Sequence, residues 1–508
     1  MRSTVKPFPK LKVATRCVLL ARFLVFSSLL TAQTNQKVVD LSWQQDQDQV
    51  AGYNIYRSDV SGGPYTKLNS ALDPNTNYVD STVLAAHTYY YVTTAVNSLG
   101  QESGYSNESQ ANVPNGGGGN EFTIGNFSGN SGSGQPSAGL TLDKNGNLFG
   151  TTKTGGTYNQ GTVFKLTAGS SGFTQTILYN FTGSQDGAQP AAELVFDSAG
   201  NLYGTTTTGG SGSCNGGCGV VFELQPSSGN WSESVLYSFT GGADGAQPSA
   251  ALSFDSTGNL YGTSVLGGNA GSNCSYGCGV IFKLTKGSGG WTESAVYTFS
   301  GGNDGAYPYA SVVFDTSGNL YGTTSGGGSY GKGTAFKLTP NGSTWTETIL
   351  HAFAGSADGA SPYAPLVLDS AGTPYGTAAQ GGTGGYGVVF KIVPNGRGGW
   401  KESLIHTFGN KPAATPMVGL LFDNAGNLYG TTQLGGDFTS CGGACGTLFE
   451  LTPVPNKAWS FKTLHQFGRV GDGYRPVGRL VQDSSGNLYG ATQMGGPQGS
   501  GTVFVLKP

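Results

Sequence analysis

One eight-residue phrase recurs seven times along this chain of 508 residues, and it limits the possible folds more than any other feature. In its third copy the phrase is Asp255-Ser-Thr-Gly-Asn-Leu-Tyr-Gly262. The closing glycines lie 54 to 60 residues apart, at Gly150, Gly204, Gly262, Gly322, Gly376, Gly430 and Gly490. Periods of this size indicate propellers or solenoids, in which each unit buries its apolar face against its neighbours.

Each repeat divides into four expected strands. In the third repeat they cover residues 251–254, 260–264, 279–284 and 291–299. Asp255 begins a tight turn between the first two strands, where its side chain caps backbone amides and Gly258 takes a positive φ. With 87 glycines and 22 prolines the chain disfavours helices, while 37% hydrophobic residues suffice to fill cores. Four antiparallel strands per repeat are typical of a β-propeller blade.

The two ends of the repeat region complement each other. The seventh repeat stops after its third strand, Gly501–Leu506, so its fourth strand is missing. The segment Glu121–Phe127 has the pattern of a fourth strand such as Thr176–Phe181. The N-terminal segment is therefore expected to complete the last blade, which an open solenoid would not require. The sequence predicts an all-β fold in which residues 121–508 form a closed seven-bladed β-propeller.

The wording of the repeats resembles the GloVer tandem-repeat family over residues 121–508. The resemblance rests on the Gly-Asn-Leu-Tyr-Gly-Thr core and on Gly155-Gly156 followed by Gly161 to Leu166. It implies a secreted bacterial protein of a group with varied surface anchors, and it implies no particular activity. The chain departs from the family pattern in having no recognisable C-terminal anchor.

Residues 37–113 have a different sequence pattern from the repeats and resemble a fibronectin type III domain. Trp43 stands at the core tryptophan position, Tyr53-x-Ile-Tyr56-Arg57 forms the central strand, and Tyr89 or Tyr91 is the corner tyrosine. The resemblance implies a small immunoglobulin-like β-sandwich that acts as a spacer or interaction module. The Gly-rich residues 114–120 read as a flexible linker to the repeats.

Residues 1–32 are expected to be a secretory signal peptide. They contain six basic and no acidic residues, and the apolar run Phe23–Ala32 is too short to span a membrane. Removing them leaves 20 basic against 29 acidic residues, a net charge of −9. Such a surface lacks the footprint of nucleic-acid binding. We expect an extracellular or cell-surface monomer that binds no nucleic acid and has no membrane span after signal cleavage.

Six cysteines follow the signal segment as three close pairs. Because an even number in a secreted chain favours disulfides, we expect three loop disulfides. The pairs are Cys214/Cys218, Cys274/Cys278 and Cys441/Cys445. A structural zinc site would need four ligands together, and these pairs lie in different repeats without a nearby histidine.

Most candidate catalytic residues follow the repeat and are expected to be structural. His351, His406 and His465 occupy positions where other repeats carry tyrosine. The connector aspartates recur five times, which indicates backbone capping, with calcium binding as the open alternative: Asp186, Asp244, Asp304, Asp358 and Asp472. Only Glu193, Asp437 and Arg479 break the pattern, and they are weak catalytic candidates. We expect Glu193 and Arg479 to face each other near the central channel, and we expect no metal or other cofactor.

Aromatic residues gather in the loops that should share one rim. Alternating chain direction places the loops between the second and third strands beside the connectors between repeats. These segments carry Tyr158, Tyr276, Tyr307, Tyr330, Tyr386, Phe438 and Tyr474. Aromatic rings among Gly, Ser, Thr and Asn can stack on sugars, so the leading hypothesis is a non-catalytic binding or adhesion protein with a polysaccharide, surface glycan or protein partner. The alternatives are loop-to-loop packing in a structural envelope or matrix component, and a carbohydrate-active enzyme that uses the channel.

Overall fold

The computed structural model describes residues 12–17, 37–43, 50–80, 82–83, 87–113, 120–129, 134–169, 172–227, 229–268, 271–409, 413–436, 441, 445–469 and 472–507. Every regular element within these ranges is a β-strand, so the predicted all-β class is confirmed. The chain separates into two compact units, Met1–Gly117 and Gly118–Pro508. Asp437 and Phe438 lie outside the described residues, as does most of the predicted signal segment.

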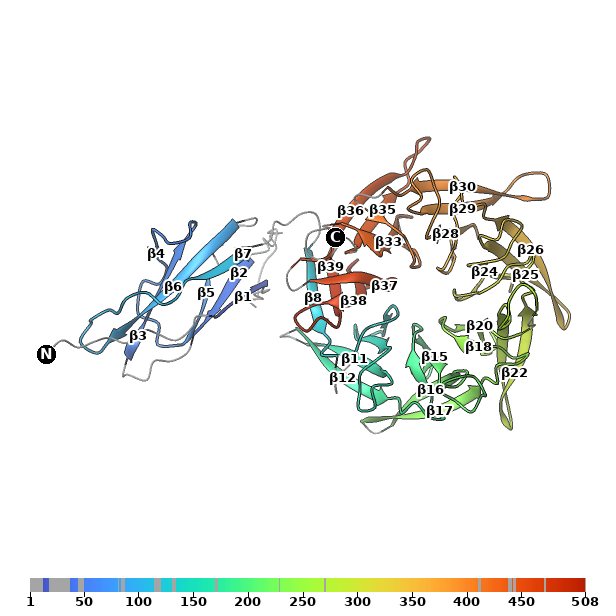
Figure 1. Ribbon diagram of the computed structural model, residues 1–508, viewed down its shortest axis with the longest axis horizontal. Helices are drawn as coiled ribbons and strands as arrows, with labels where there is room; N and C mark the ends of the chain where they lie inside the picture. The colour runs from blue at the N-terminus through green and yellow to red at the C-terminus, as the bar shows by residue number, and fades with distance from the viewer. Residues whose placement is uncertain are drawn as a thin grey trace, which may run out of the picture. The chain divides into compact units, whose positions relative to one another are not determined.

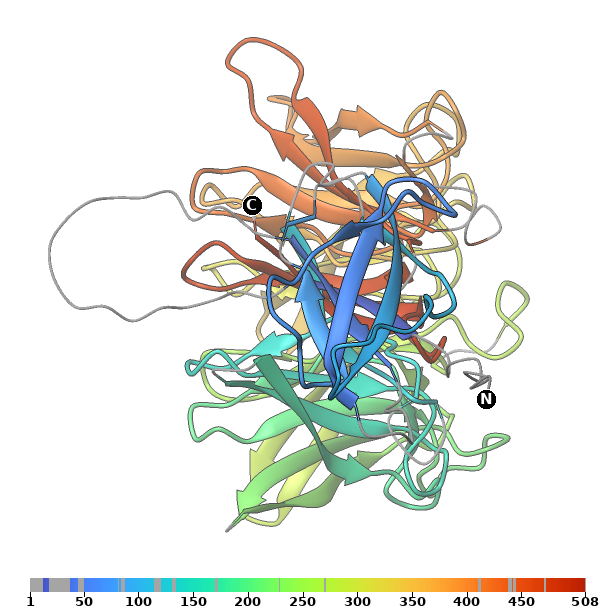
Figure 2. The ribbon, with the colours of Figure 1, turned by 90° about the vertical axis from the view of Figure 1, so that its left-hand side faces the viewer.

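The first unit consists of two antiparallel sheets, drawn in blue in Figure 2. One sheet has the order β1 (Lys12–Cys17), β2 (Lys37–Ser42), β5 (Asn77–Asp80). The other has the order β4 (Thr66–Lys67), β3 (Val50–Ser58), β6 (His87–Asn97), β7 (Ser109–Val113). Strand β1 falls inside residues 1–32, so part of the segment predicted to be a signal peptide is paired with β2 here. The signal peptide stays a prediction.

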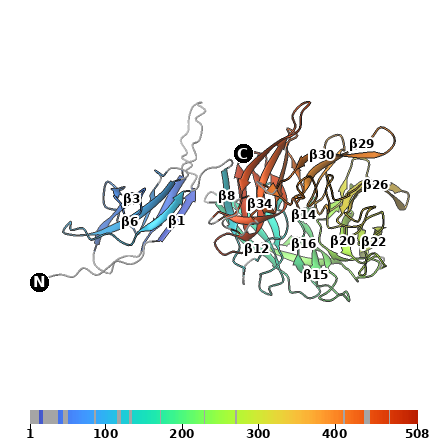
Figure 3. The ribbon, with the colours of Figure 1, turned by 45° about the horizontal axis from the view of Figure 1, so that its top comes forward.

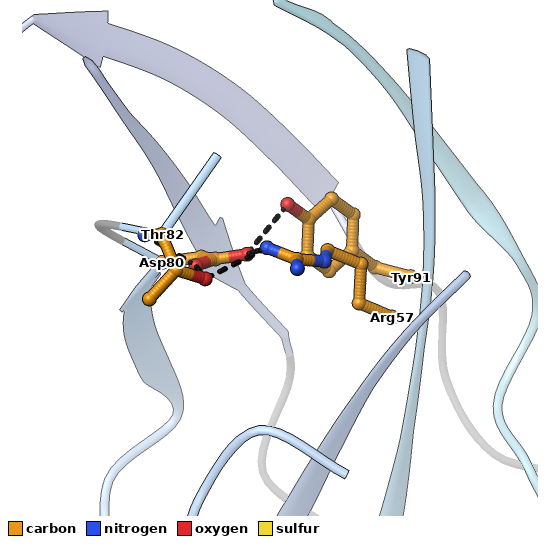
Figure 4. Close-up of polar contacts among 4 residues, drawn as sticks. All are labelled: Arg57, Asp80, Thr82 and Tyr91. Carbon is orange, nitrogen blue, oxygen red and sulfur yellow. Dashed lines mark hydrogen bonds and ion pairs between the residues drawn. The ribbon is translucent and has the colours of Figure 1, made fainter. Parts of the chain in front are cut away.

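The core of the first unit is built around Trp43 and a buried carboxylate. Trp43 packs edge-on against Tyr53, with ring centroids 5.2 Å apart. Asp80 accepts hydrogen bonds from the Tyr91 hydroxyl at 2.9 Å and from Arg57 at 2.8 Å (Figure 4). Burial acts to raise the pKa of Asp80, but hydrogen bonds from Thr82, Tyr91 and Arg57 outweigh it and lower this pKa. The buried tyrosine is thus fixed by an ionised side chain.

The second unit contains seven four- or five-stranded antiparallel sheets among its described residues. The first sheet comprises β9 (Thr141–Leu142), β10 (Leu148–Thr152), β11 (Thr162–Gly169) and β12 (Gly172–Asn180). The second comprises β13 (Ala188–Pro190), β14 (Val195–Phe196), β15 (Leu202–Thr208), β16 (Val220–Ser227) and β17 (Asn230–Ser238). The third comprises β18 (Ala246–Pro248), β19 (Ser253–Phe254), β20 (Leu260–Leu266), β21 (Val280–Gly287) and β22 (Gly290–Thr298).

The remaining sheets repeat this order. The fourth comprises β23 (Val313–Phe314), β24 (Leu320–Thr324), β25 (Thr334–Asn341) and β26 (Thr344–Ala352). The fifth comprises β27 (Val367–Leu368), β28 (Pro374–Ala378), β29 (Val388–Pro394) and β30 (Trp400–Thr407). The sixth comprises β32 (Leu421–Phe422), β33 (Leu428–Thr432), β35 (Thr447–Thr452) and β36 (Ser460–Gln466), beside the short pair β31 (Ala413–Ala414) and β34 (Leu434–Gly435). The first strand of most sheets is shorter than expected, with two residues paired instead of four.

The last sheet combines the two ends of the repeat region. It has the order β37 (Gly473–Gln482), β38 (Leu488–Gly495), β39 (Thr502–Lys507), β8 (Asn120–Asn126). Strand β8 pairs antiparallel with β39, which confirms the pairing predicted for residues 121–127. In Figures 1 and 3 the colours run round the second unit in chain order, and the red last sheet lies beside the teal first one.

The cores of the second unit lie between neighbouring sheets. Seven apolar clusters among the described residues each join two successive sheets, and one of them joins the last sheet to the first. At each junction a Phe at the end of a fourth strand packs on a Phe of the next sheet's third strand, with ring centroids 5.0–5.4 Å apart. The pairs are Phe127–Phe164, Phe181–Phe222, Phe239–Phe282, Phe299–Phe336, Phe353–Phe390, Phe408–Phe449 and Phe467–Phe504.

The recurring phrase forms the turn that its residues predict. In the third copy Asp255 Oδ1 accepts hydrogen bonds from the amides of Thr257 and Asn259, both at 2.9 Å. Its Oδ2 accepts a hydrogen bond from the Asn259 side chain at 2.7 Å, and Gly258 has a φ of 86°. These bonds lower the pKa of Asp255 against the opposing effect of burial. The carboxylate therefore holds the turn in its ionised form.

The closing glycine of the phrase is needed for space. A Cβ on Gly262 would lie 2.4 Å from Phe282 Cζ and 2.9 Å from Leu252 Cδ2. The glycines at this position in the other six copies meet the corresponding Phe ring at 2.4–2.7 Å. Because real Cβ contacts are never this short, the Phe–Phe junctions depend on a residue without a side chain at this position.

We expect Gly262→Ala to destabilise the second unit by about 1–3 kcal/mol, since an added methyl overpacks a filled core. Gly289→Ala is the matched control, because a Cβ there meets nothing within 4 Å. Denaturant unfolding of both variants measures the difference. The double variant Gly262→Ala/Phe282→Leu should recover part of the loss, and equal stability of the two single variants would contradict this explanation of the glycine.

Candidate functional site

Two sets of loops are joined along one rim of the second unit. In six connectors, the residue before a proline adopts a left-handed conformation, with φ of 52–60°, at Gln189, Gln247, Tyr307, Ser361, Thr415 and Arg475. Each donates its backbone N–H to a carbonyl of the loop between the second and third strands of the preceding repeat, at 2.8–2.9 Å. For example, Tyr307 donates to Cys278 and Ser361 donates to Lys332. The two loop sets therefore share a rim, as the alternating chain direction predicts.

The left-handed residues mark this rim as a constrained surface. Side chains other than glycine rarely adopt this conformation, which costs on the order of 1 kcal/mol or more per residue. The following proline is buried in each of these connectors. The fold thus holds six variable side chains at equivalent, partly exposed points, where differences between repeats change the surface without changing the backbone.

An adjacent tyrosine pair breaks the repetition at this rim. Tyr309 and Tyr363 occupy equivalent positions in successive repeats, directly after the connector proline, and their ring centroids lie 5.4 Å apart at an angle of 62°. The other repeats carry smaller or aliphatic residues there: Ser137, Ala191, Ser249, Met417 and Val477. Tyr309 is 43% exposed. Burial and the nearby Tyr363 and Tyr307 raise the pKa of the Tyr309 hydroxyl, so Tyr309 stays neutral at physiological pH.

The pair belongs to the inner side of the second unit. In Figure 1 the connector strand β18 lies toward the middle of the unit and the fourth strand β22 lies outside. Burial alternates along residues 308–312, so Tyr309 and Ser311 share one side of the segment. At the position equivalent to Ser311 the fifth, sixth and seventh repeats lie side by side, because a Cβ on Gly419 would contact both Pro365 and Arg479. Tyr309 and Tyr363 precede Ser311 and Pro365 by two residues, so each lies on the same side of its segment as that residue.

Glu193 and Arg479 occupy the position equivalent to Ser311 in their repeats and contact each other, as expected. The Arg479 guanidinium lies 3.6 Å from Glu193 Oε2, and the Arg479 backbone N–H donates to Glu193 Oε1 at 2.8 Å. The Glu193 side chain crosses Gly139 of the intervening first repeat, where a Cβ would lie 2.2 Å from Oε1. This ion pair links the second and seventh repeats. The Glu193 carboxylate and the Arg479 guanidinium therefore bind each other.

The aromatic residues that the sequence singled out divide into two groups. Tyr158, Tyr276 and Tyr330 are 56%, 80% and 63% exposed. Tyr307, Tyr386 and Tyr474 are half-buried and pack against the apolar clusters between sheets, as the loop-packing alternative predicts. Tyr309 and Tyr363 were not among the residues predicted from the sequence. The sequence feature that could have indicated them is the replacement of smaller or aliphatic residues by tyrosine two positions before the equivalents of Glu193.

The three predicted disulfides are present and fasten the rim loops. They join Cys214 to Cys218, Cys274 to Cys278 and Cys441 to Cys445. Each lies against the glycine that begins a connector, namely Gly241, Gly301 and Gly468. In two repeats without a disulfide, side chains of Gln160 and Lys332 occupy the equivalent place beside Gly183 and Gly355. The disulfides therefore replace a side-chain contact that the other loops already make.

Buried acidic groups lie between sheets, on the outer strands. The connector aspartates cap backbone amides as predicted. For example, Asp304 Oδ2 accepts a hydrogen bond from the backbone N–H of Ser300 at 2.7 Å. Tyr297 donates a hydrogen bond to Glu347 of the next sheet at 3.0 Å. Burial and the charge of Asp304 raise the pKa of Glu347 to about 7, against the effect of that hydrogen bond.

Three further junctions follow this arrangement. Burial, with Asp186, Asp244 and Asp358 nearby, raises the pKa of Glu233, Glu293 and Glu402 respectively to about 7. One oxygen of each of the four glutamates is buried without a hydrogen-bond partner among the described residues. His351 and His465 replace the tyrosine and contact Asp358 and Asp472 at 3.1 and 3.0 Å. These histidines serve as structural substitutes for tyrosine, as predicted.

A search of the described residues finds no group of three or more His, Cys, Asp or Glu side chains arranged to hold a metal ion. The same residues contain no helix with the length and apolarity needed to cross a membrane.

Comparison with known sequences gives a match to most of the chain. A sequence profile described as the Gloeobacter/Verrucomicrobia repeat matches residues 90–274 and 269–504. A segment of 85 residues, 17% of this chain, is 44% identical to a protein named amylopullulanase from Thermoanaerobacterium thermosulfurigenes. The chain spans only 4% of the length of that relative.

Two solved structures show limited similarity. An Fn3-like protein from Clostridium thermocellum is 35% identical, covering 15% of this chain and 78% of its own, with a TM-score of 0.14. A hypothetical selenium-binding protein from Sulfolobus tokodaii is 10% identical, covering 82% of this chain and 92% of its own, with a TM-score of 0.44.

Proposed function

This chain belongs to the Gloeobacter/Verrucomicrobia repeat family, and on that premise we propose that it is a secreted, non-catalytic binding protein whose repeats present a rim to a polysaccharide or surface glycan. Residues 121–508 would form a closed seven-bladed β-propeller. The seven sheets, the pairing of β8 with β39 and the apolar cluster that joins the last sheet to the first support this architecture.

The surrounding parts of the chain are proposed to serve this role. Residues 1–32 would be a signal peptide, 37–113 a fibronectin type III-like module and 114–120 a linker. Three disulfides support an oxidising, extracellular location. The mature protein is proposed to be monomeric.

The observation that carries the binding proposal is the Tyr309–Tyr363 pair. A partly exposed aromatic pair offers apolar faces on which a pyranose ring can stack, since such rings present C–H groups on one face. The neighbouring left-handed positions Gln247, Ser361 and Thr415 supply hydroxyl and amide groups that can hydrogen-bond sugar hydroxyls. The 85-residue similarity to a protein named amylopullulanase is consistent with a carbohydrate-related setting, although it covers little of that enzyme.

We expect the double variant Tyr309→Ser/Tyr363→Ala to reduce retention on the preferred polysaccharide at least ~10-fold, because loss of stacking costs on the order of 1 kcal/mol or more for each of the two rings. Both substitutions install residues that other repeats carry at this position, so the backbone should tolerate them. Pull-down of the full chain on insoluble starch, cellulose and chitin measures retention, with and without EDTA.

Tyr158→Ala is the control, because Tyr158 is exposed on the same rim without an aromatic pair partner among the described residues. Equal retention of the double variant and the unmodified chain would contradict the assignment to Tyr309 and Tyr363. Retention that EDTA abolishes would instead favour calcium at the connector aspartates. No retention on any polymer would favour the structural-component alternative.

A further inference from the structure

Three tyrosines form a second aromatic surface on the first unit. Tyr105 lies between Tyr56 and Tyr65, with ring centroids 5.3 and 5.2 Å away and interplanar angles of 73° and 62°. The rings of Tyr56 and Tyr65 are therefore steeply inclined to the ring of Tyr105, which is 54% exposed. Tyr56 belongs to β3, on the sheet face opposite the buried Tyr53 and Ile55. This tyrosine surface is independent of the glycan site proposed above.

A glutamate fixes each outer ring of the tyrosine surface. The Tyr56 hydroxyl donates to Glu102 Oε1 at 2.6 Å, and the same oxygen accepts hydrogen bonds from Asn54 Nδ2 at 2.7 Å and from Thr94 Oγ1. These hydrogen bonds lower the pKa of Glu102, with Thr94 contributing most. At the other end the Tyr65 hydroxyl donates to Glu108, and this bond, together with those from the Gly62 amide and the Ser61 hydroxyl, lowers the pKa of Glu108. Both carboxylates are therefore charged at neutral pH.

The chemistry of the tyrosine surface favours a cation. The hydroxyls of Tyr56 and Tyr65 are already donated to the glutamates, so the surface offers two negative charges and several π faces but few free donors. A sugar needs donors as well as acceptors, whereas an ammonium or guanidinium group needs only acceptors and ring faces. The charge of Lys67 acts on Glu102 and contributes to lowering its pKa. Residues 37–113 contain eight acidic and three basic residues, a net charge of −5, which attracts a basic partner over a longer range.

We propose that the Tyr56–Tyr105–Tyr65 surface binds a lysine or arginine side chain of a basic partner polypeptide. The cation would lie over the exposed Tyr105 ring, between the flanking rings and within reach of the two carboxylates. The first unit would then attach the repeat unit to a basic protein, while the rim of the second unit binds its own ligand.

Binding of the full chain to an immobilised alternating Lys-Gly peptide tests the proposal, with an alternating Glu-Gly peptide as the reference surface. We expect Tyr105→Ala to weaken binding at least ~5-fold, because one cation–π contact is lost. Tyr105→Phe keeps the ring and should bind within ~2-fold of the unmodified chain. Lys67→Ala should strengthen binding, because it removes a repelling charge. Raising the salt concentration should weaken every interaction that remains.

The assignment is overturned by several results. One is that the unmodified chain binds both peptides equally or binds neither. Another is that Tyr105→Phe loses as much binding to the Lys-Gly peptide as Tyr105→Ala does. If Tyr105→Ala instead abolished retention on a neutral polysaccharide, the tyrosine surface would be a sugar site. Because Tyr105 is exposed, an unchanged melting temperature of its variants confirms that lost binding is not lost folding.

Discussion

Deletion of residues 120–127 should abolish the cooperative unfolding of the second unit. This segment contains strand β8, which pairs with β39 along its whole length from Asn126–Thr502 to Asn120–Lys507. It also ends in Phe127, which is 1% exposed and packs on Phe164 of the first sheet at 5.0 Å. The deletion removes both the outer strand of the last sheet and half of one inter-sheet contact.

The expected loss is comparable to the stability of a whole domain. Truncating a buried Phe to Ala costs about 3–5 kcal/mol. Each hydrogen bond lost between β8 and β39 adds about 0.5–1.5 kcal/mol. Since domains are stable by about 5–15 kcal/mol in total, the deleted chain should not retain a single sharp transition. It should also expose the edge of β39, which favours aggregation.

Calorimetry and intrinsic fluorescence of the full chain and the deletion variant measure this effect. A synthetic peptide of residues 120–129, added in trans, should restore the transition in a saturable manner, because it supplies the missing strand and Phe127. A peptide of the same composition in scrambled order is the control. If the deletion shifted the melting temperature by only a few degrees, or if both peptides rescued equally, β8 would not be the element that joins the two ends.

Features set by local sequence could be predicted, as the turns and β8 illustrate. The Asp255 turn is made by residues within four positions of one another, so its pattern appears directly in the sequence. The β8 segment was recognisable because six other copies of the same strand were available for comparison. The Gly262 position recurs equally often, but its cause lies in contact with Phe282 and Leu252, which no turn rule describes.

Features set by neighbouring repeats could not be predicted in the same way. Glu347 occupies an outer strand position that the sequence pattern presents as polar and solvent-facing. In the structure Glu347 is buried beside Tyr297 and Asp304 of the preceding repeat. Tyr386 and Tyr474 were expected in exposed rim segments, but the adjacent sheets cover much of each ring. Tyr309 and Tyr363 meet although 54 positions separate them, because successive repeats place equivalent residues side by side.

The second unit should be more stable at pH 5 than at pH 8. Glu233, Glu293, Glu347 and Glu402 have pKa values raised from 4.5 to about 7, chiefly by burial. Between these two pKa values the folded chain keeps protons that the unfolded chain has released. The stabilisation is therefore fully present below pH ~4.5 and is lost as the pH rises to about 7.

The size of the effect follows from the four glutamates and from the groups whose pKa shifts act in the opposite direction. A full shift corresponds to about 3 kcal/mol per glutamate, which we reduce to ~1 kcal/mol because these side chains are only half-buried and solvent screens them. Burial lowers the pKa of His406 to about 4, which opposes the trend by destabilising the fold as the pH falls below about 6.5. Below pH ~4 the turn aspartates, whose pKa values are lowered, also lose their contribution. The net gain from pH 8 to pH 5 is thus ~3 kcal/mol.

Denaturant unfolding at pH 5 and pH 8 measures this difference, and glutamine substitution identifies its source. The first repeat already carries Gln175 at the equivalent position, so Glu→Gln at the four sites should preserve the fold. The variant with all four substitutions should lose the rise in stability between pH 8 and pH 5 and keep only the opposing trend of His406. Substitution of Glu108, a charged residue of the first unit, should leave the profile of the second unit unchanged. A wild-type profile that is flat or rises with pH over this range would contradict the raised pKa values of the junction glutamates.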